Sequence, residues 1–157
     1  MSSLIADAGL STPTKSANFV KLLVFEIGKL TLALPILQVQ KVVRQNEVHG
    51  SGLSHINLTH LHDRELAIVD LHQKIFGTSL TQSGTGYFII SKNIVGEPLG
   101  IVVSQAPTLI DVPMNQIRLL PNAYRRSDTL EIASHVTVLS PTETATTIFI
   151  LDLSRLV

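Results

Sequence analysis

Two aspartates are the first candidates for acid–base chemistry in this sequence. Asp70 and Asp152 each follow an apolar segment and precede a short segment with a helical pattern. A pair of carboxylates catalyses proton transfer where burial or nearby groups drive the two pKa values apart. However, Gln73 follows Asp70 at the spacing of a capping box, and Asp152 is placed to accept the first helical N–H groups. We therefore interpret both aspartates as structural helix caps.

Histidine is the second residue type that could do chemistry, because most of the six histidines lie near one another. His60 and His62 are two residues apart and would share one face of a strand. Paired imidazoles can bind zinc, with Asp63 or Glu65 as an oxygen ligand. Because the sequence lacks cysteine and a His-Glu-x-x-His motif, we interpret these residues as polar strand-edge or interface histidines. A histidine-based metal-binding or metal-dependent hydrolytic module is the alternative.

Other motifs for ligands and nucleophiles are absent or incomplete. Gly84-Thr-Gly86 lacks the third glycine and the following helix of a nucleotide-binding fingerprint. No P-loop, nucleophile elbow or calcium-binding loop occurs. The lack of cysteine also excludes thiolate metal sites and cysteine nucleophiles. We predict a protein that is not an enzyme and has no cofactor.

The composition argues against several classes of partner. The 157 residues include 12 Lys and Arg against 12 Asp and Glu, a balance that argues against nucleic acid and against a polybasic membrane surface. Charged residues make up only 15%, compared with about 25% in an average soluble domain. We therefore expect part of the apolar surface to be kept for protein partners. Exposed β edges with so few charges also make self-association possible.

No segment has the length and apolarity of a transmembrane helix, since Leu22–Leu37 is interrupted by charged residues, a glycine and a proline. The N-terminus lacks the basic start and apolar centre of a secretory signal. We predict a cytoplasmic location without membrane insertion.

The elements that must position these residues are mostly short strands. Residues 1–18 are rich in Ser, Thr and Ala, and we interpret them as a flexible N-terminal tail. Beyond them Ile, Val and Thr dominate, and Gly, Pro, Asn and Ser break the apolar runs, which predicts an all-β fold. We expect strands at Val20–Ile27, Leu30–Leu34, Leu37–Arg44, Tyr87–Ser91, Leu99–Val103, Thr108–Val112, Ile132–Leu139 and Thr147–Leu151, another within His60–Leu71, and short helices at Leu71–Phe76 and Ser154–Val157.

An internal repeat indicates two similar halves. The pattern Leu30-Thr-Leu-Ala-Leu-Pro35 recurs as Leu99-Gly-Ile-Val-Val-Ser104, and Ala67-Ile-Val-Asp-Leu71 recurs as Phe149-Ile-Leu-Asp-Leu153. Such a repeat predicts two small β-barrels of about five strands each, packed around a shared hydrophobic core. We place the domain at 19–157, with intertwined subdomains at roughly 19–80 and 86–157.

Six short motifs also occur in order along the chain. They are Leu23-Val-Phe-Glu-Ile-Gly28, Leu34-Pro-Ile-Leu-Gln-Val-Gln-Lys-Val42, Ile68-Val-Asp-Leu71, Leu99-Gly-Ile-Val-Val103, Gln116-Ile117 and Ile150-Leu-Asp-Leu153. Together they resemble the CheW-like domain of bacterial chemotaxis signalling, over nearly the whole of residues 19–157.

This resemblance implies two five-stranded barrels of the Src-homology-3 type and a non-enzymatic adaptor. Such an adaptor couples a chemoreceptor's cytoplasmic helix hairpin to a CheA-type histidine kinase, in chemotaxis, phototaxis or pilus motility. The resemblance implies that the receptor hairpin binds in the groove between the barrels and that the kinase's regulatory domain pairs with the barrel faces. Helix-in-groove binding fits a charge-poor surface. We expect partner-binding residues at Val39, Lys41, Val43, Leu61, His62, Arg64, Val103 and Leu109.

The sequence departs from the family pattern at two places. His60-Leu61-His62-Asp63 replaces an Asn-Leu-Arg-Gly stretch, and Lys41 replaces the usual acidic residue. A histidine and a lysine cannot form the charge-assisted, bidentate contact of an arginine with a carboxylate. We therefore expect altered partner specificity. A small-ligand-binding β-barrel sensor without a protein partner is a third interpretation.

Overall fold

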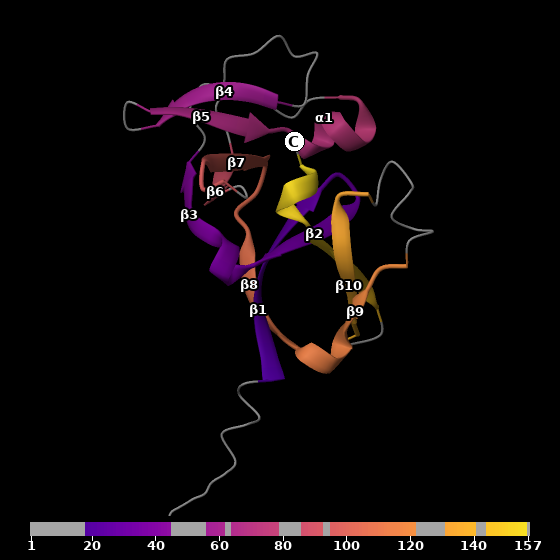
Figure 1. The fold of residues 1–157 in the computed structure, drawn as a ribbon. Coiled ribbons are helices and arrows are strands. Elements are labelled where there is room, and N and C mark those ends of the chain that lie inside the picture. Colours follow the sequence, from indigo (N-terminus) through magenta and orange to yellow (C-terminus); the bar gives the residue numbers. More distant parts are fainter. Residues whose placement is uncertain are drawn as a thin grey trace, which may run out of the picture.

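The structure of the chain is a computed structural model. Its fold consists mostly of strands (Figure 1). The structure describes residues 18–44, 56–61, 64–78, 86–92, 95–121, 131–140 and 144–156, without the side chains of 56–61, 64 and 65. The described strands form two sheets. The all-β prediction is therefore confirmed.

The first sheet has six strands in the order β8-β1-β2-β11-β10-β9. At its centre is an antiparallel hairpin of β1 and β2, whose turn contains Gly28 with a φ of 59°. Glycine adopts this left-handed conformation without a steric penalty. The strands are β1 (Phe19–Ile27), β2 (Leu30–Pro35), β8 (Thr108–Pro113), β9 (Ile117–Leu119), β10 (Ala133–Leu139) and β11 (Thr146–Leu151).

The second sheet has five strands in the order β3-β6-β7-β5-β4. An antiparallel hairpin of β6 and β7 lies at its centre, and β7 pairs in parallel with β5. This arrangement repeats the first sheet, where β2 pairs in parallel with β11. The strands are β3 (Val39–Arg44), β4 (Ile56–Leu61), β5 (Arg64–Val69), β6 (Tyr87–Lys92) and β7 (Pro98–Val103).

The two halves of the chain exchange their central hairpins. The β1–β2 hairpin pairs with β8 and β11 from the second half, whereas the β6–β7 hairpin pairs with β3 and β5 from the first half. Each sheet is therefore built from both halves. Subdomain boundaries at 19–80 and 86–157 do not separate the two sheets, because the contacts that complete each sheet are made across those boundaries.

Short connections curve the first sheet into a barrel. The 3₁₀ turn η3 (Met114–Gln116) joins β8 directly to β9, although these strands lie at opposite edges of the sheet. A three-residue link can join the two edges only if the sheet closes on itself. We call the barrel built on the first sheet the first barrel, and the one built on the second sheet the second barrel.

Three hydrophobic cores fill the molecule, because the central strands are buried on both faces. The shared core lies between the barrels and takes alternate residues of both hairpins, such as Phe25 and Ile89. The first-barrel core takes the intervening residues of β1 and β2, such as Leu22 and Ala33. The second-barrel core contains Leu66, Ile68, Phe88, Ile90 and Val102. Period-two alternation thus explains why these strands have nearly continuous apolar sequences.

The predicted helices and strands agree with the structure except at a few ends and at the strands β4 and β9, which the sequence analysis did not predict. The six-residue helix α1 (Leu71–Phe76) is confirmed and ends at Gly77, whose φ is 78°. The C-terminal helix is instead a 3₁₀ turn, η4 (Leu153–Arg155), which lies close to α1 (Figure 1). The segment 37–44 was predicted as one strand, but its first residues belong to the 3₁₀ turn η2 (Ile36–Gln38). This turn follows Pro35 as η3 follows Pro113, and a proline there fixes φ without removing a needed donor.

Candidate partner-binding surface

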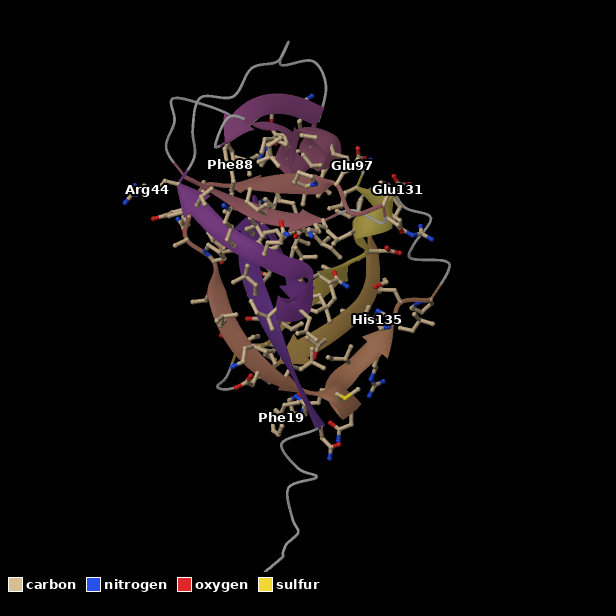
Figure 2. All side chains as sticks on the ribbon, turned by 60° about the vertical axis from the view of Figure 1, so that its left-hand side comes forward. Phe19, Arg44, Phe88, Glu97, Glu131 and His135 are labelled. Atoms are coloured by element: carbon tan, nitrogen blue, oxygen red, sulfur yellow. The ribbon has the colours of Figure 1, made fainter. Side chains whose placement is uncertain are left out.

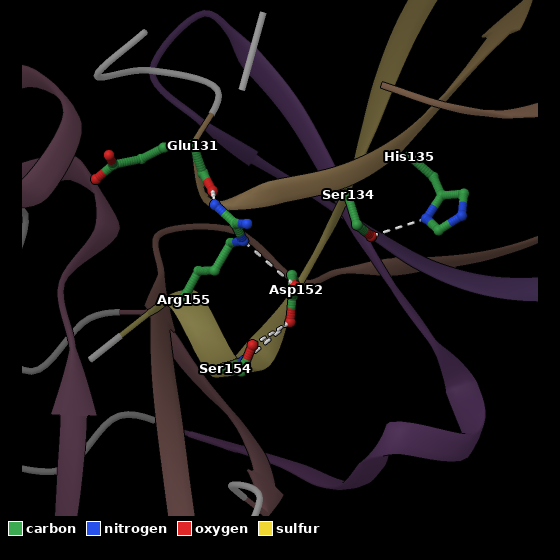
Figure 3. A network of polar contacts seen from close by, with 6 residues as sticks. All are labelled: Glu131, Ser134, His135, Asp152, Ser154 and Arg155. Atoms are coloured by element: carbon green, nitrogen blue, oxygen red, sulfur yellow. Dashed lines mark hydrogen bonds and ion pairs between the residues drawn. The ribbon is translucent and has the colours of Figure 1, made fainter. Parts of the chain in front are cut away.

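Asp70 and Asp152 occupy equivalent places at the ends of β5 and β11. Asp70 is fully buried, and its Oδ1 accepts a hydrogen bond of 3.0 Å from the backbone N–H of Gln73. The Oδ1 of Asp152 accepts hydrogen bonds of 3.1 Å from the N–H and 2.6 Å from the hydroxyl of Ser154 (Figure 3). Both side chains therefore satisfy N–H groups at the start of a helical turn.

Glu131 connects the C-terminal turn to α1. Arg155 donates a hydrogen bond of 3.1 Å from Nη1 to the backbone oxygen of Glu131, and its Nε lies 3.4 Å from Asp152 Oδ2 (Figure 3). The carboxylate of Glu131 lies 3.9 Å from the Lys74 ammonium on α1. Helix α1 follows β5 of the second sheet, and residue 131 precedes β10 of the first sheet. These contacts therefore connect the two barrels at one end.

The strand β3 carries three of the predicted partner-binding residues, but a bulge changes their orientation. Val39 pairs with Ser91 and Lys41 pairs with Ile90, so Gln40 is the extra residue of a bulge. As a result Val39 packs against the shared core and Val43 against the second-barrel core. Val39 therefore lies on the opposite face of β3 from Lys41 and Val43, because a single inserted residue reverses the alternation.

The next predicted residues lie on the β4–β5 hairpin. Leu61 and Arg64 pair with each other at its end, and His60 pairs with Glu65, but the side chains of these four residues are outside the described part. His62 lies outside the described residues altogether. In the order of the second sheet, this hairpin is at the opposite edge from β3. The zinc hypothesis for His60 and His62 thus remains a prediction.

The last two predicted residues differ in exposure. Val103 has no exposed surface and packs in the shared core, where it cannot contact a partner. Leu109 is 52% exposed on the edge strand β8. It pairs with Leu23, whose side chain lies in the shared core. Leu109 is therefore on the same face of the first sheet as the shared core, at its exposed edge.

An exposed apolar surface lies where the two barrels meet. It comprises Leu37 of η2, Val42 of β3 and Leu109 of β8, with exposed fractions of 96%, 38% and 52%. We call these three residues the junction surface. A single exposed leucine is common on a protein surface, but a cluster of exposed apolar side chains marks an interaction site.

The strand register places the parts of the junction surface near one another. Leu22 of β1 pairs with Pro35, the residue before η2, and on its other side with Ile110, the residue after Leu109. Since neighbouring strands are about 4.8 Å apart, η2 starts about two strand spacings from Leu109. In Figure 2, β3 runs from Arg44 toward the strands that lead down to Phe19.

Two charged contacts involve the strands β8 and β3, which carry Leu109 and Val42. Lys21 and Asp111, on β1 and β8, form an exposed ion pair of 3.3 Å. The guanidinium of Arg44 lies 5.6 Å from the centroid of the Tyr87 ring. Exposed ion pairs contribute little to stability, so these contacts mainly set the charge pattern seen by a partner.

Two kinds of feature are absent from the part of the chain described above. No helix in that part of the chain is long and apolar enough to span a bilayer. It also holds no group of three or more His, Cys, Asp or Glu side chains that could bind a metal ion.

Comparison with known proteins assigns the family. The model of the CheW-like domain matches residues 21–157. The chain belongs to the CheW-like domain family. This membership confirms the resemblance inferred from the six motifs and places the chain among the scaffold and adaptor proteins of chemotaxis-type signalling.

The fold of the CheW-like chain is also found in a solved structure. The scaffolding protein TtCheW from Thermoanaerobacter tengcongensis superimposes with a TM-score of 0.71 at 18% identity, over 87% of this chain and 86% of that protein. No curated protein matches the sequence significantly. The two-barrel fold is therefore shown at the level of architecture.

Two of the three residues of the junction surface, Leu37 and Val42, were not among the predicted partner-binding residues. Leu37 was predicted as part of a strand face, and Val42 was not selected. A local signal for Leu37 does exist, because Pro35-Ile-Leu-Gln-Val39 and Pro113-Met-Asn-Gln-Ile117 share a pattern and both form a 3₁₀ turn. Such a turn exposes its middle residue, as it does at Leu37.

Proposed function

We propose that this CheW-like chain couples a chemoreceptor's cytoplasmic helix hairpin to a CheA-type histidine kinase, and that the junction surface binds the receptor. One observation carries the proposal: Leu37, Val42 and Leu109 are exposed where the two barrels meet. An apolar strip with few charges suits the apolar face of an amphipathic helix hairpin. The family supplies the cytoplasmic setting of such a complex, which we adopt for this chain.

The charge of Lys41 supports a further proposal on specificity. Lys41 is exposed on the edge strand β3, where it follows the bulge and lies on the opposite face of the strand from Val42. A receptor helix with an acidic residue opposite Lys41 would be favoured, whereas one with a basic residue there would be rejected. We propose that Lys41 shifts receptor preference away from that of family members with an acidic residue at this position.

The receptor-binding proposal can be tested by titrating the full chain with a labelled receptor hairpin from the same cell. Leu37→Asp should weaken binding at least tenfold. In the complex the Leu37 side chain would be buried against the receptor, and the loss of such an anchor typically costs about 2 kcal/mol or more of binding free energy. Val138→Asp is a control, since Val138 is 50% exposed on β10, a strand that pairs with β9 and β11 and with none of the elements that carry the junction surface. Equal binding by both variants and the unmodified chain would refute the proposal.

The specificity proposal needs a different pair of variants. Lys41→Glu should improve binding of a receptor hairpin whose contacting face is basic and weaken binding of the native one. Lys41→Gln separates loss of the positive charge from gain of a negative one. If the three chains bind both hairpins with the same relative affinity at low salt, Lys41 has no role in specificity.

Coupling itself requires both partners at once. The receptor and the kinase's regulatory domain should bind the full chain together, with the kinase remaining bound by the Leu37→Asp chain. We propose that the kinase uses the barrel faces outside the junction surface. Loss of kinase binding on Leu37→Asp, with the fold intact, would mean that the two partners share one surface.

A further inference from the structure

The edge strand β3 contains a bulge directly after the turn η2. Val39 pairs with Ser91, and Lys41 pairs with the next residue of β6. Gln40, between them, is exposed and is the inserted residue of the bulge. A bulge bends its strand and increases the local right-handed twist. The chain on the η2 side of the bulge therefore leaves the second sheet in a direction that an unbroken strand would not take.

The bulge distinguishes β3 from the strand at the corresponding edge of the first sheet. That strand, β8, lies beside β1 as β3 lies beside β6. All six residues of β8 (Thr108–Pro113) pair with consecutive residues of β1 without a break. The repeated frame of the two sheets thus does not require a bulge in an edge strand, and β3 has one for a reason of its own.

The bulge separates two members of the junction surface. Val42 follows the bulge and pairs with Ile89, whose side chain lies in the shared core. Val42 is therefore on the shared-core face of the second sheet, at its exposed edge. Leu37 precedes the bulge, in the turn that joins β2 of the first sheet to β3 of the second. Its orientation relative to Val42 depends on the backbone between them, which contains the bulge.

The bend at the bulge is fixed on both of its sides. Val39 packs against the shared core beside its partner Ser91, which is fully buried. The Ser91 hydroxyl has no hydrogen-bond partner among the described residues, so this position uses the small size of the side chain. Beyond the bulge, Val43 packs against the second-barrel core. Because the pairing with β6 continues on both sides of Gln40, the bend has one defined geometry.

We propose that Gln40 is a positioning residue for receptor binding, because the bulge that it forms sets the angle between Leu37 and Val42. Neighbouring anchors on one helix face are about 5–6 Å apart, so a different bend in β3 would change which anchors Leu37 and Val42 can contact together. The role belongs to the backbone of Gln40, since its side chain is exposed. This inference rests on the proposed receptor-binding function.

Deletion of Gln40 tests the role of the bulge, because the pairs on both sides can keep their partners. The full chain without Gln40 should bind the labelled receptor hairpin at least tenfold more weakly, as expected for a displaced anchor. Its affinity for the kinase's regulatory domain should change less than twofold. In a chain that carries Leu37→Asp, the deletion should change receptor affinity less than twofold, because the residue that the bulge positions is already lost. A deletion that weakens receptor binding equally with and without Leu37→Asp, or that weakens kinase binding as much, would overturn the proposal.

A pair of substitutions tests the same role without shortening the chain. Gln40→Gly gives the bulge more backbone freedom and should weaken receptor binding about twofold to fivefold. Gln40→Ala also removes the side chain but keeps ordinary backbone freedom, and it should restore the affinity of the unmodified chain. Gln116→Gly is the matched control, since Gln116 is an exposed glutamine in the equivalent turn η3 and should tolerate glycine without a change in receptor affinity.

The outcomes separate this inference from the proposal on which it rests. Equal receptor affinity of the Gln40→Gly and Gln40→Ala chains, in an assay where Leu37→Asp weakens binding, would overturn the role of the bulge and leave the receptor-binding proposal standing. If Leu37→Asp itself leaves receptor binding unchanged, both fail.

Discussion

The two barrels have equivalent central hairpins, but side chains of different size occupy matching places in their cores. Both place an exchanged hairpin at the centre, with one parallel and one antiparallel neighbour. In the second barrel, Phe88 is fully buried and Gly100 lets neighbouring side chains approach closely. In the first barrel, Val24 and Ala33 take the places of Phe88 and Val102. The repeated topology thus preserves the strand pairings, while the sizes of the core residues at matching places differ.

The largest expected effect concerns the ring that fills the second barrel. Phe88→Ala should lower the free energy of unfolding by about 3–5 kcal/mol, because it leaves a large cavity. Val24→Ala, at the corresponding place of the first barrel, should cost only roughly 1–2 kcal/mol. Urea denaturation of both variants measures the difference. Equal losses would contradict the larger contribution that we assign to the Phe88 ring.

Gly100, on β7 of the second barrel, provides another comparison between the two barrels. A Cβ atom there would lie 2.5 Å from Ile68 Cδ1 and 3.3 Å from Leu66 Cδ2. Gly100→Ala should therefore destabilise the chain by about 1–3 kcal/mol, the usual cost of overpacking. Thr31 takes the matching place in the first hairpin, and Thr31→Ala should have less effect on the thermal midpoint. A neutral Gly100→Ala would mean that the second barrel has spare room.

The two aspartate caps provide the smallest of the three comparisons. Asp70→Ala should cost about 1 kcal/mol, because it removes the bond to the Gln73 N–H and leaves buried groups unpaired. Asp152 is more exposed, and Ser154 remains near its turn, so Asp152→Ala should cost less. Chemical denaturation of the two variants side by side gives the ranking. The reverse ranking would show that the C-terminal turn contributes more than α1.

Local pattern was sufficient to predict most strands and the two-barrel plan. Alternating and continuous apolar runs reflect burial on one or both faces, and the repeat of Leu30–Pro35 at Leu99 reflects equivalent hairpins. The exchange of these hairpins was not predictable, because it depends on pairings between residues far apart in the chain. No composition or periodicity distinguishes an exchanged hairpin from one that stays in its own half.

The candidate surface was predictable only in part. Lys41 and Leu109 are exposed as expected, but Val103 is buried because β7 is covered on both faces. The bulge at Gln40 inserts one residue into β3 and thereby separates Val39 from Val43. The exposure of Leu37 results from the 3₁₀ turn after Pro35. Bulges and short turns act on single residues, so a period-two pattern cannot locate them.

The adaptor proposal is tested most directly by asking whether the chain bridges receptor and kinase. Membranes that contain the receptor are sedimented with the CheA-type kinase, in the presence of the full chain, its Leu37→Asp variant or neither. We predict that the kinase sediments with receptor membranes only when the unmodified chain is present, and that Leu37→Asp abolishes most of this recruitment. Recruitment that is the same with and without the chain would contradict the account.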